Sequence, residues 1–335
     1  MLKYILKRLA LSVFILIGVS LIIYILIRCM PSSFIDNKIA AMNQGGATVP
    51  QETIDAMKAL YGLEDDSFLG IIKGYLGWFK SMCRLDFGTS FKYGSPVTEV
   101  IKSHMGVSFA VALIATIFEF MIAIPLGITA ATHQYSIRDY VVTVLVMIGI
   151  SLPSFFLGQI AKYVFAMKLG WLPSGGFGTT SATFPDTFGG MIAETADKIP
   201  YLILPIAVVV ILSIGSRMRM TRTNMLEVLN SDYIRTARAK GLKESKVIYK
   251  HAFRNTLIPL VTSLAGLLPT LFSGAIITEQ VFDLPGIGNI ALSAMMEADI
   301  PFIMGYNMFL AFLSVIGVLL ADLMYAVVDP RVKLK

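Results

Sequence analysis

The chain has 335 residues, of which 56% are hydrophobic and only 15% are charged, and its formal net charge is +6. Soluble globular domains carry about 25% charged residues, so this composition excludes an ordinary soluble domain and indicates a membrane protein that crosses the bilayer several times. The positive charge invites the hypothesis of a nucleic-acid partner. However, the basic residues gather between apolar runs, which is typical of a membrane protein that binds no nucleic acid.

The first apolar run extends without a break over residues 9–27, which is long enough to cross the hydrocarbon core as a helix. Basic residues precede it, as they would precede the core of a signal peptide. However, a signal core is only about 7–15 residues long, and residues 28–31 make a poor cleavage site. We therefore expect residues 1–30 to form a retained N-terminal transmembrane helix.

Residues 31–104 are expected to form a small folded cap on the outer side of the membrane. Residues 51–61 have the pattern of an amphipathic helix that opens after a proline, and residues 68–82 form a second apolar stretch. The sequence Asp-Phe-Gly at residues 86–88 is typical of a turn.

The remaining residues, 105–335, are expected to form a core of five further helices, which makes an all-α membrane protein with six transmembrane helices in total. Pro125, Pro153 and Pro269 fall in the second, third and fifth spans, where we expect them to kink the helix. The predicted spans are residues 9–27, 105–131, 140–167, 199–216, 257–278 and 302–328.

The distribution of charge predicts that both termini lie in the cytoplasm. Lys and Arg residues are concentrated near the N-terminus, in residues 217–259 and at the C-terminus. The predicted outer loop 279–301 has no Lys or Arg but has four acidic residues. Cytoplasmic loops carry the excess of basic residues in membrane proteins, so residues 217–259 belong on the cytoplasmic side, between the fourth and fifth helices.

The basic segment 217–259 holds ten Lys and Arg residues against three acids, so it is too polar to cross a bilayer. Ser231 or Asp232 is a good N-cap for a short helix that runs to Lys240, and Gly241 supplies the left-handed residue that ends such a helix. A second helix is expected to start near Lys243. Its α-helical period places Lys246, Lys250 and Arg254 on one face and Tyr249, Ala252, Phe253 and Leu257 on another.

Two interpretations of this segment follow from the residues. Its cations can bind anionic lipid at the membrane surface. Alternatively, the helix–glycine–helix shape, with the small residues Thr236 and Ala237 at its tip, favours a surface on which another protein docks.

The segment Asp232–Pro259, DYIRTARAKGLKESKVIYKHAFRNTLIP, resembles the EAA loop of ABC-importer permeases, in the version found in the oligopeptide, dipeptide and nickel group. The general pattern is Glu-Ala-Ala, three residues and then Gly. Residues 235–237, Arg-Thr-Ala, and Gly241 occupy those places. The family resemblance also covers YILKRLALSVFILIGVSLIIYILIR (4–28), SLPSFFLG (151–158), LGWLPSGG (169–176), EQVFDLPGIG (279–288) and ADLMYAVVDPR (321–331).

The resemblance implies a multi-pass permease subunit of a bacterial inner-membrane ABC importer, which forms half of a translocation pore for oligopeptides or dipeptides. It implies four kinds of partner: a second homologous permease, two ATP-binding subunits that hold the ATP and magnesium, an extracytoplasmic peptide-binding protein and membrane lipid. The resemblance does not determine the exact substrate, and nickel or another solute remains an alternative to peptides. The residues expected to couple to the ATPase are Asp232, Tyr233, Arg235, Thr236, Ala237, Arg238, Lys240 and Gly241.

Three motifs depart from the family pattern, and all lie on the predicted outer side. Residues 31–34 replace Pro-Gly-Asp-Pro, residues 85–88 replace Gly-Asp-Leu-Gly, and residues 298–301 replace Arg-Asp-Tyr-Pro. These departures leave the coupling segment intact, but they bear on contacts with the binding protein and on the substrate.

Glu119 lies in the middle of the second predicted span, where an ionisable group is costly and usually functional. One hypothesis is that it lines the translocation path and meets a peptide amino terminus. The alternative is a protonated or hydrogen-bonded side chain at a helix contact. A rival function, an ion-coupled secondary transporter that uses Glu119, explains the buried acid but not the basic segment, and the two halves show no inverted repeat. A lipid-anchored scaffold or channel subunit is a weaker third alternative.

The sequence predicts no catalytic residues, no metal site and no nucleotide site in this chain. It has no Gly-rich loop before Lys-Ser/Thr of the Walker type, and its three histidines are scattered. Cys29 and Cys83 both fall on the predicted outer side and could pair, although two unpaired thiols are the simpler interpretation. Energy for transport must therefore come from a partner protein.

Overall fold

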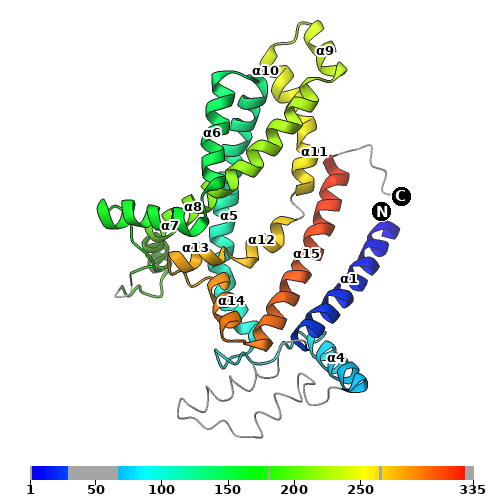
Figure 1. Cartoon of the computed structure of the whole chain (residues 1–335), viewed down its shortest axis with the longest axis vertical. Coiled ribbons are helices and arrows are strands. Elements are labelled where there is room, and N and C mark those ends of the chain that lie inside the picture. The colour runs from blue at the N-terminus through cyan, green and yellow to red at the C-terminus, as the bar shows by residue number, and fades with distance from the viewer. Residues whose placement is uncertain (1, 29–66, 180–181, 264–265, 329–335) are drawn as a thin grey trace. The chain divides into compact units, whose positions relative to one another are not determined.

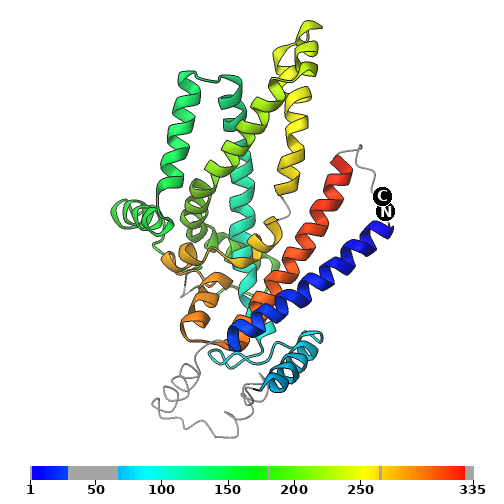
Figure 2. The same cartoon turned by 45° about the vertical axis from the view of Figure 1, so that its right-hand side comes forward.

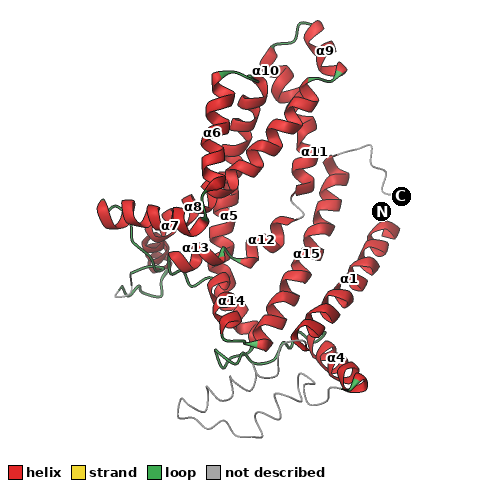
Figure 3. Cartoon of the chain, viewed as in Figure 1, coloured by secondary structure: helices red, strands yellow, loops and turns green. Residues whose placement is uncertain are grey.

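The computed structural model describes residues 2–28, 67–179, 182–263 and 266–328, and every regular element in these ranges is a helix (Figure 3). The only β-type pairing among them is an isolated bridge between Thr89 and Pro96. The prediction of an all-helical protein is confirmed for this part of the chain. The amphipathic helix predicted at residues 51–61, the first departing motif at 31–34 and Cys29 lie outside the described residues.

Among the described residues, one compact unit comprises residues 2–28, 67–105 and 290–316. Its apolar core joins the first helix to the predicted apolar stretch 68–82, which the structure shows to be a helix. Tyr24, Trp78 and Met304 are buried there, and the Tyr24 and Trp78 rings stack with centroids 6.1 Å apart. The elements that contribute to this unit are α1 (Leu2–Arg28), α4 (Phe68–Met82), the start of α5 (Val97–Thr132), the end of α14 (Ile287–Met296) and the first part of α15 (Ile300–Val328).

The second compact unit comprises the described residues of 106–289 and residues 317–328. It holds most of α5, and α6 packs along α8 within it (Figures 1 and 2). Besides parts of α5, α14 and α15, its elements are α6 (Ile137–Ser151), α7 (Ser154–Ala161), the π-helix η1 (Lys162–Lys168), α8 (Phe188–Leu229), α9 (Asp232–Ala239), α10 (Glu244–Lys246), the π-helix η2 (Val247–Phe253), α11 (Arg254–Ser263), α12 (Leu267–Ser273) and α13 (Ile276–Val281).

Four helices among the described residues are long and apolar enough to cross a membrane: Leu6–Arg28, Val97–Thr132, Phe188–Leu229 and Ile300–Asp322. A fifth span is obtained if the bent pair 137–151 and 154–168 is counted as one. The described helices therefore do not by themselves reach the predicted number of six, because the third and fifth predicted spans are broken.

The third predicted span bends by 99° between its two halves. Pro153 stands at the break, immediately before α7, where its missing N–H cannot continue the hydrogen bonds of α6. The fifth predicted span is broken at Gly274, whose φ of 75° separates α12 from α13. Pro269 lies in the first turn of α12, so it stands near the start of a new helix and does not kink a continuous one.

The fourth span is longer than its apolar run. Helix α8 has 42 residues and continues through Arg217, Arg219 and Arg222 to Leu229, well beyond the predicted end at residue 216. A change from apolar to polar side chains marks the limit of hydrophobicity, but it does not interrupt the backbone hydrogen bonds of a helix. The first part of the basic segment is therefore a rigid extension of this helix.

Close packing of α5 against α8 depends on Gly127. A Cβ atom at this position would lie 2.7 Å from Cβ of Thr221 and 2.8 Å from the carbonyl oxygen of Met218. Met218 and the neighbouring Ala123 and Ala130 are buried in the same contact. Because the opposing atom is part of the α8 backbone, a side chain at residue 127 can be accommodated only if the two helices move apart.

We predict that Gly127→Leu lowers the free energy of unfolding by about 1–3 kcal/mol, the usual range for overpacking a tight contact. Gly106→Leu is the matched control, because Gly106 lies in the same helix and has no atom within 4 Å of the added Cβ. Thermal unfolding of the purified proteins in one detergent would compare them. Equal melting temperatures of the two variants would contradict the assigned contact.

Candidate functional site

The short helix predicted in the basic segment is present as α9, Asp232–Ala239. Ser231 occupies the N-cap position with an extended backbone, but its hydroxyl donates to the carbonyl of Val228 at 2.6 Å and does not cap the amides of α9. Gly241 follows with a φ of 72°, and its N–H donates to the carbonyl of Arg238 at 2.9 Å. The predicted helix and its left-handed terminal glycine are therefore both confirmed.

Ile234 and Ala237 form the inner face of α9. Both are buried against Met225 of α8 and against Val247 and Ala252 of η2. Ala237 is 8% exposed, so it does not share the outward position that the sequence predicted for it beside Thr236. The two residues are three positions apart, so they share one side of the helix. Through this side, α9 packs against the apolar cluster formed by α8 and η2.

The segment after α9 differs from the predicted α-helix. Val247 and Ala252 are both buried although they are five residues apart, because η2 is a π-helix whose turn holds more residues than an α-turn. The predicted inner face included Tyr249, which is 60% exposed. The prediction used an α-helical period, and nothing in the residue pattern signals the π-helix.

The other predicted coupling residues form the outer face of α9 and its C-terminal turn. Asp232, Tyr233, Arg235, Thr236, Arg238, Lys240 and Gly241 are all exposed.

Two contacts hold this outer face in place. Arg238 Nη2 lies 2.7 Å from Oε1 of Glu244, and this guanidinium holds the pKa of the Glu244 carboxyl below its usual value. The Tyr233 hydroxyl accepts a hydrogen bond of 3.0 Å from Nδ2 of Asn255. The outer face of α9 is therefore a small basic surface, and the buried side chains of Ile234 and Ala237 attach it to the rest of the protein.

Glu119 makes an ion pair with Arg217, the first residue of the basic segment 217–259. Nε of Arg217 donates to Oε1 of Glu119 at 2.9 Å, and Nη1 of Arg217 donates to Oγ of Ser263 at 2.7 Å. The guanidinium carbon also lies 4.6 Å from the centroid of the Phe120 ring. Of the two earlier hypotheses, the hydrogen-bonded helix contact is confirmed. The partner was missed because only the tertiary structure brings α5 and α8 together.

The same ion pair forms part of the wall of a cavity of about 370 Å³. The Glu119 side chain is 9% exposed and the Arg217 side chain 15%. The cavity lies between α5, α8 and the region of α11 and α12. The polar lining residues besides the pair are Thr116, Ser213, Ser216, Ser263 and Thr270. Glu119 therefore makes a helix contact and lines a polar cavity at the same time.

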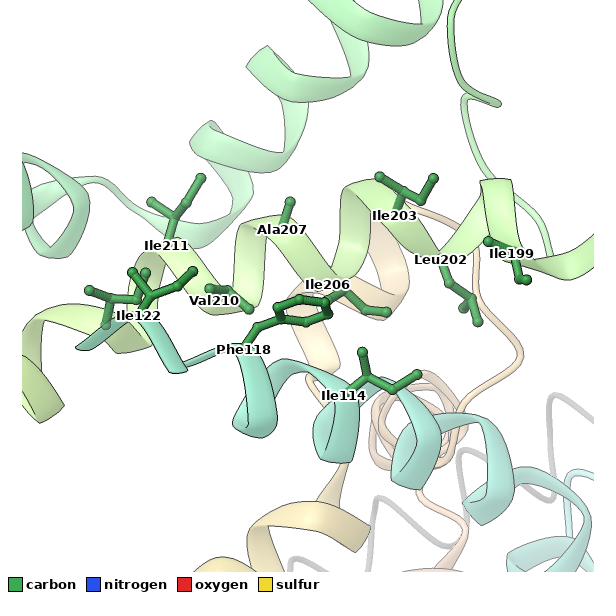
Figure 4. Close-up of a pocket in the computed structure, with 11 residues that line it drawn as sticks. Ile114, Phe118, Ile122, Ile199, Leu202, Ile203, Ile206, Ala207, Val210 and Ile211 are labelled. Carbon is green, nitrogen blue, oxygen red and sulfur yellow. The ribbon is translucent and has the colours of Figure 1, made fainter. Parts of the chain in front are cut away.

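A second hollow of about 540 Å³ lies on a different stripe of the same two helices and is lined only by apolar side chains (Figure 4). Phe118 of α5 points toward Ile206 of α8 there. An apolar surface of this kind suits the hydrocarbon of a bilayer or another helix, whereas a stripe of hydroxyls and charges suits water or a polar solute. The two stripes distinguish the polar side of the α5–α8 pair from its apolar side.

Glu279 is a structural centre that sequence analysis noted only as an acid of a predicted outer loop. It is fully buried and accepts hydrogen bonds from Oγ of Ser108 at 2.7 Å, the N–H of Asn289 at 2.9 Å and the N–H of Ala275 at 3.0 Å. A Cβ at Gly286 would lie 2.4 Å from its carboxylate, which explains the glycines of the motif at residues 279–288. Glu279 thus organises the broken helices around α13.

Two further buried carboxylates were also missed. Asp139, at the start of α6, accepts from Nη2 of Arg222 in α8 at 2.8 Å. Asp299, just before α15, accepts from the hydroxyl of Ser90 and from the N–H groups of Phe91 and Lys92, the latter two at 3.1 Å each. These contacts fix helix ends, and the sequence offers no local signal for them because the partners are far apart in the chain.

The described residues contain no group of three or more His, Cys, Asp or Glu side chains arranged to hold a metal ion. Lys162, near the end of the third predicted span, donates from Nζ to the carbonyl of Val281 at 3.0 Å, so it pairs with the backbone inside its own unit.

Comparison with known proteins shows which family this chain resembles. Residues 123–334 match the family model of the binding-protein-dependent transport system inner membrane component. The chain is 36% identical to the oligopeptide transport system permease protein AppB of Bacillus subtilis (strain 168), covering 99% of this chain and 100% of that protein. It is 34% identical to the dipeptide transport system permease protein DppB of Alkalihalophilus pseudofirmus, covering 99% of this chain and 100% of that protein.

A solved structure shares the fold. A chain of the MetNI methionine ABC transporter in inward-facing conformations aligns with a TM-score of 0.50 at 16% identity, covering 69% of this chain and 97% of that one.

The protein is thus a helical membrane component of a transporter. The chain belongs to the family of binding-protein-dependent transport system inner membrane components. It is accordingly a multi-pass permease of the cell membrane and not the ATP-hydrolysing enzyme, which is a separate subunit in this family. The rival hypothesis of an ion-coupled secondary transporter does not fit this family.

We predict that Ala237→Glu detaches α9 from α8 and η2, because an unpaired carboxylate buried among apolar side chains costs roughly several kcal/mol. Ala239→Glu is the matched control, since Ala239 lies in the same helix and is exposed. Hydrogen exchange of the α9 amides should become faster in Ala237→Glu alone. Unchanged protection in that variant would show that the buried contact is not what holds α9.

Proposed function

We propose that this chain is one of two permease subunits of an ATP-driven importer for oligopeptides or dipeptides. The proposed complex contains a second homologous permease, two ATP-binding subunits that hold ATP and magnesium, and an extracytoplasmic peptide-binding protein, all in membrane lipid. The peptide substrate is supported by relatives of 33–36% identity whose names specify peptide transport. Near-complete coverage of both chains supports carrying that role to this protein.

The proposed topology has six crossings, with both termini in the cytoplasm. Residues 1–30 are the first crossing, residues 31–104 the outer cap and residues 105–335 the permease core, with the coupling segment 217–259. The broken helices α11 to α13 supply the crossing that no single long helix provides. The clustering of Lys and Arg in residues 217–259 supports a cytoplasmic place for α9.

The observation that carries the proposed coupling role is the two-sided construction of α9. Its outer face, from Asp232 to Gly241, is polar and exposed, while Ile234 and Ala237 tie it to α8 and η2. A force applied by an ATPase subunit to the outer face would therefore pass into α8 as a rigid-body movement. Ala237 contributes to coupling from the inner side of α9, through its packing against α8 and η2.

Transport would proceed by alternating access. Closure of the ATPase dimer on ATP would push α9, α8 would transmit the movement, and the cavity beside Glu119 would change its shape and its exposure. Glu119, Arg217 and Ser263 connect α5, α8 and α11, so these three helices meet at the polar cavity. We propose that this cavity lines part of the translocation path, with Glu119 in its wall.

The topology can be tested by cysteine labelling in a variant without Cys29 and Cys83. A single cysteine at Lys243 should react with a membrane-impermeant thiol reagent only after the cells are opened. A cysteine at Lys73 in α4, which is exposed in the structure, should react in spheroplasts. The reverse pattern would overturn the proposed orientation.

The coupling role predicts that Arg235→Glu weakens association with the ATPase subunits about tenfold or more, since reversal of one interfacial charge costs a few kcal/mol, roughly. The Arg235 side chain is 73% exposed and its contact with Asp232 is long, at 3.6 Å, so the fold should be unaffected. Co-purification and peptide-stimulated ATPase activity would measure the effect.

Lys250→Glu is the control for this experiment. Lys250 is an exposed cation of the same basic segment but lies in η2, outside α9. Under the proposal, only Arg235→Glu impairs association with the ATPase. If both reversals weaken the complex equally, the segment acts through general attraction to anionic lipid, and the docking role of α9 is wrong.

A further inference from the structure

The polar cavity contains one fixed cation. The Arg217 guanidinium is held on three sides, by the carboxylate of Glu119, the hydroxyl of Ser263 and the ring of Phe120. These contacts fix the plane of the guanidinium and its position in the cavity wall. Among the described residues, hydrogen-bond acceptors are found for Nε and Nη1, and a guanidinium carries further N–H donors.

Packing alone does not account for a charge pair at this place. In a hydrophobic surrounding, an ion pair can often be replaced by apolar side chains of the same volume without loss of stability. The α5–α8 contact already has a close-packed section at Gly127. Moreover, the pair stands in the wall of a cavity of about 370 Å³ and is not enclosed in the core, so its charges face space that a solute could occupy.

Three of the surrounding hydroxyl groups are arranged as acceptors. Those of Ser213, Ser216 and Thr270 donate to carbonyl groups of their own helices, at 3.2, 3.0 and 2.7 Å respectively. A hydroxyl has a single O–H, so what these side chains offer to the cavity is their oxygen lone pairs. Those lone pairs can accept from amide N–H groups. Arg217 is the one cation among the lining residues, so it is the charged donor that this wall offers to an anion.

We propose that Arg217 binds the carboxylate of a peptide in transit, while the cavity hydroxyls accept from its amide groups. The planar fork of a guanidinium matches a carboxylate in geometry, which a lysine ammonium does not. Glu119 is a positioning residue, because it holds Nε and leaves N–H groups of the two terminal nitrogens for the peptide. This proposal rests on the proposed function of peptide import.

The test measures uptake by the complete complex in proteoliposomes, with the same binding protein in every reaction. Three versions of one short neutral peptide are compared: the free acid, the C-terminal amide, and the amide with one glutamate side chain. The measured quantity is the ratio of free-acid to amide uptake in each variant relative to the wild type, so the preference of the binding protein itself cancels.

The double variant Glu119→Gln with Arg217→Gln is the decisive one, because it removes both charges and leaves neither unpaired. It should lower the free-acid to amide ratio by about tenfold relative to the wild type, the loss expected for one charged hydrogen bond. Glu119→Gln alone should retain most of the ratio. Arg219→Gln is the matched control on α8, since Arg219 is outside the cavity and contacts Sδ of Met147; it should leave the ratio unchanged.

The outcomes separate this inference from the proposed function. If the wild-type complex takes up none of the peptides, the proposed substrate class is wrong. If the wild type transports them and the double variant keeps the wild-type ratio, Arg217 does not bind the carboxylate. An equal loss in Arg219→Gln would likewise overturn the assignment. The third peptide identifies the source of the carboxylate: uptake like the free acid indicates any carboxylate, and uptake like the amide indicates the C-terminus.

Discussion

The burial of Ile234 and Ala237 against α8 and η2 is the contact on which the functional arrangement of this permease depends. A helix of eight residues has little stability of its own in water, so α9 keeps its shape only because its inner face is packed. The same contact packs α9 against the long helix α8, which is separated from α9 by two residues. Under the proposed coupling role, one small apolar cluster would both hold the surface that a partner protein contacts and transmit its movement to α8.

Two buried carboxylates in the helices of the second unit follow one constraint, which is that a charge removed from water must be paired. Glu119 meets Arg217, and Asp139 meets Arg222, so α8 supplies a cation to α5 and another to α6. Both arginines belong to the basic segment of the sequence, yet they serve the interior. Pairing at two levels along α8 holds the three helices together and leaves one pair beside a polar cavity.

The breaks in the third and fifth predicted spans also require that buried polar groups find partners within the protein. Backbone that leaves helical geometry inside a membrane protein needs internal partners, and Glu279 supplies them by accepting N–H groups from Ala275 and Asn289. Glycines at residues 274, 286 and 288 let the backbone approach this carboxylate. The bend of 99° at Pro153 and the break at Gly274 both lie beside α8, so the irregular backbone surrounds the helix that α9 would move.

The sequence by itself determined the class of protein, the short helix α9 with its terminal glycine and the apolar character of residues 68–82, because these depend on composition and on local periodicity. Tertiary structure alone decided the inward position of Ala237, the exposure of Tyr249 and the partner of Glu119. A π-helix changes which residues share a face, and an ion pair between residues 98 positions apart depends on how α5 packs on α8. Hydropathy reports the environment of each segment, whereas helix breaks and charge pairs are set by contacts between segments.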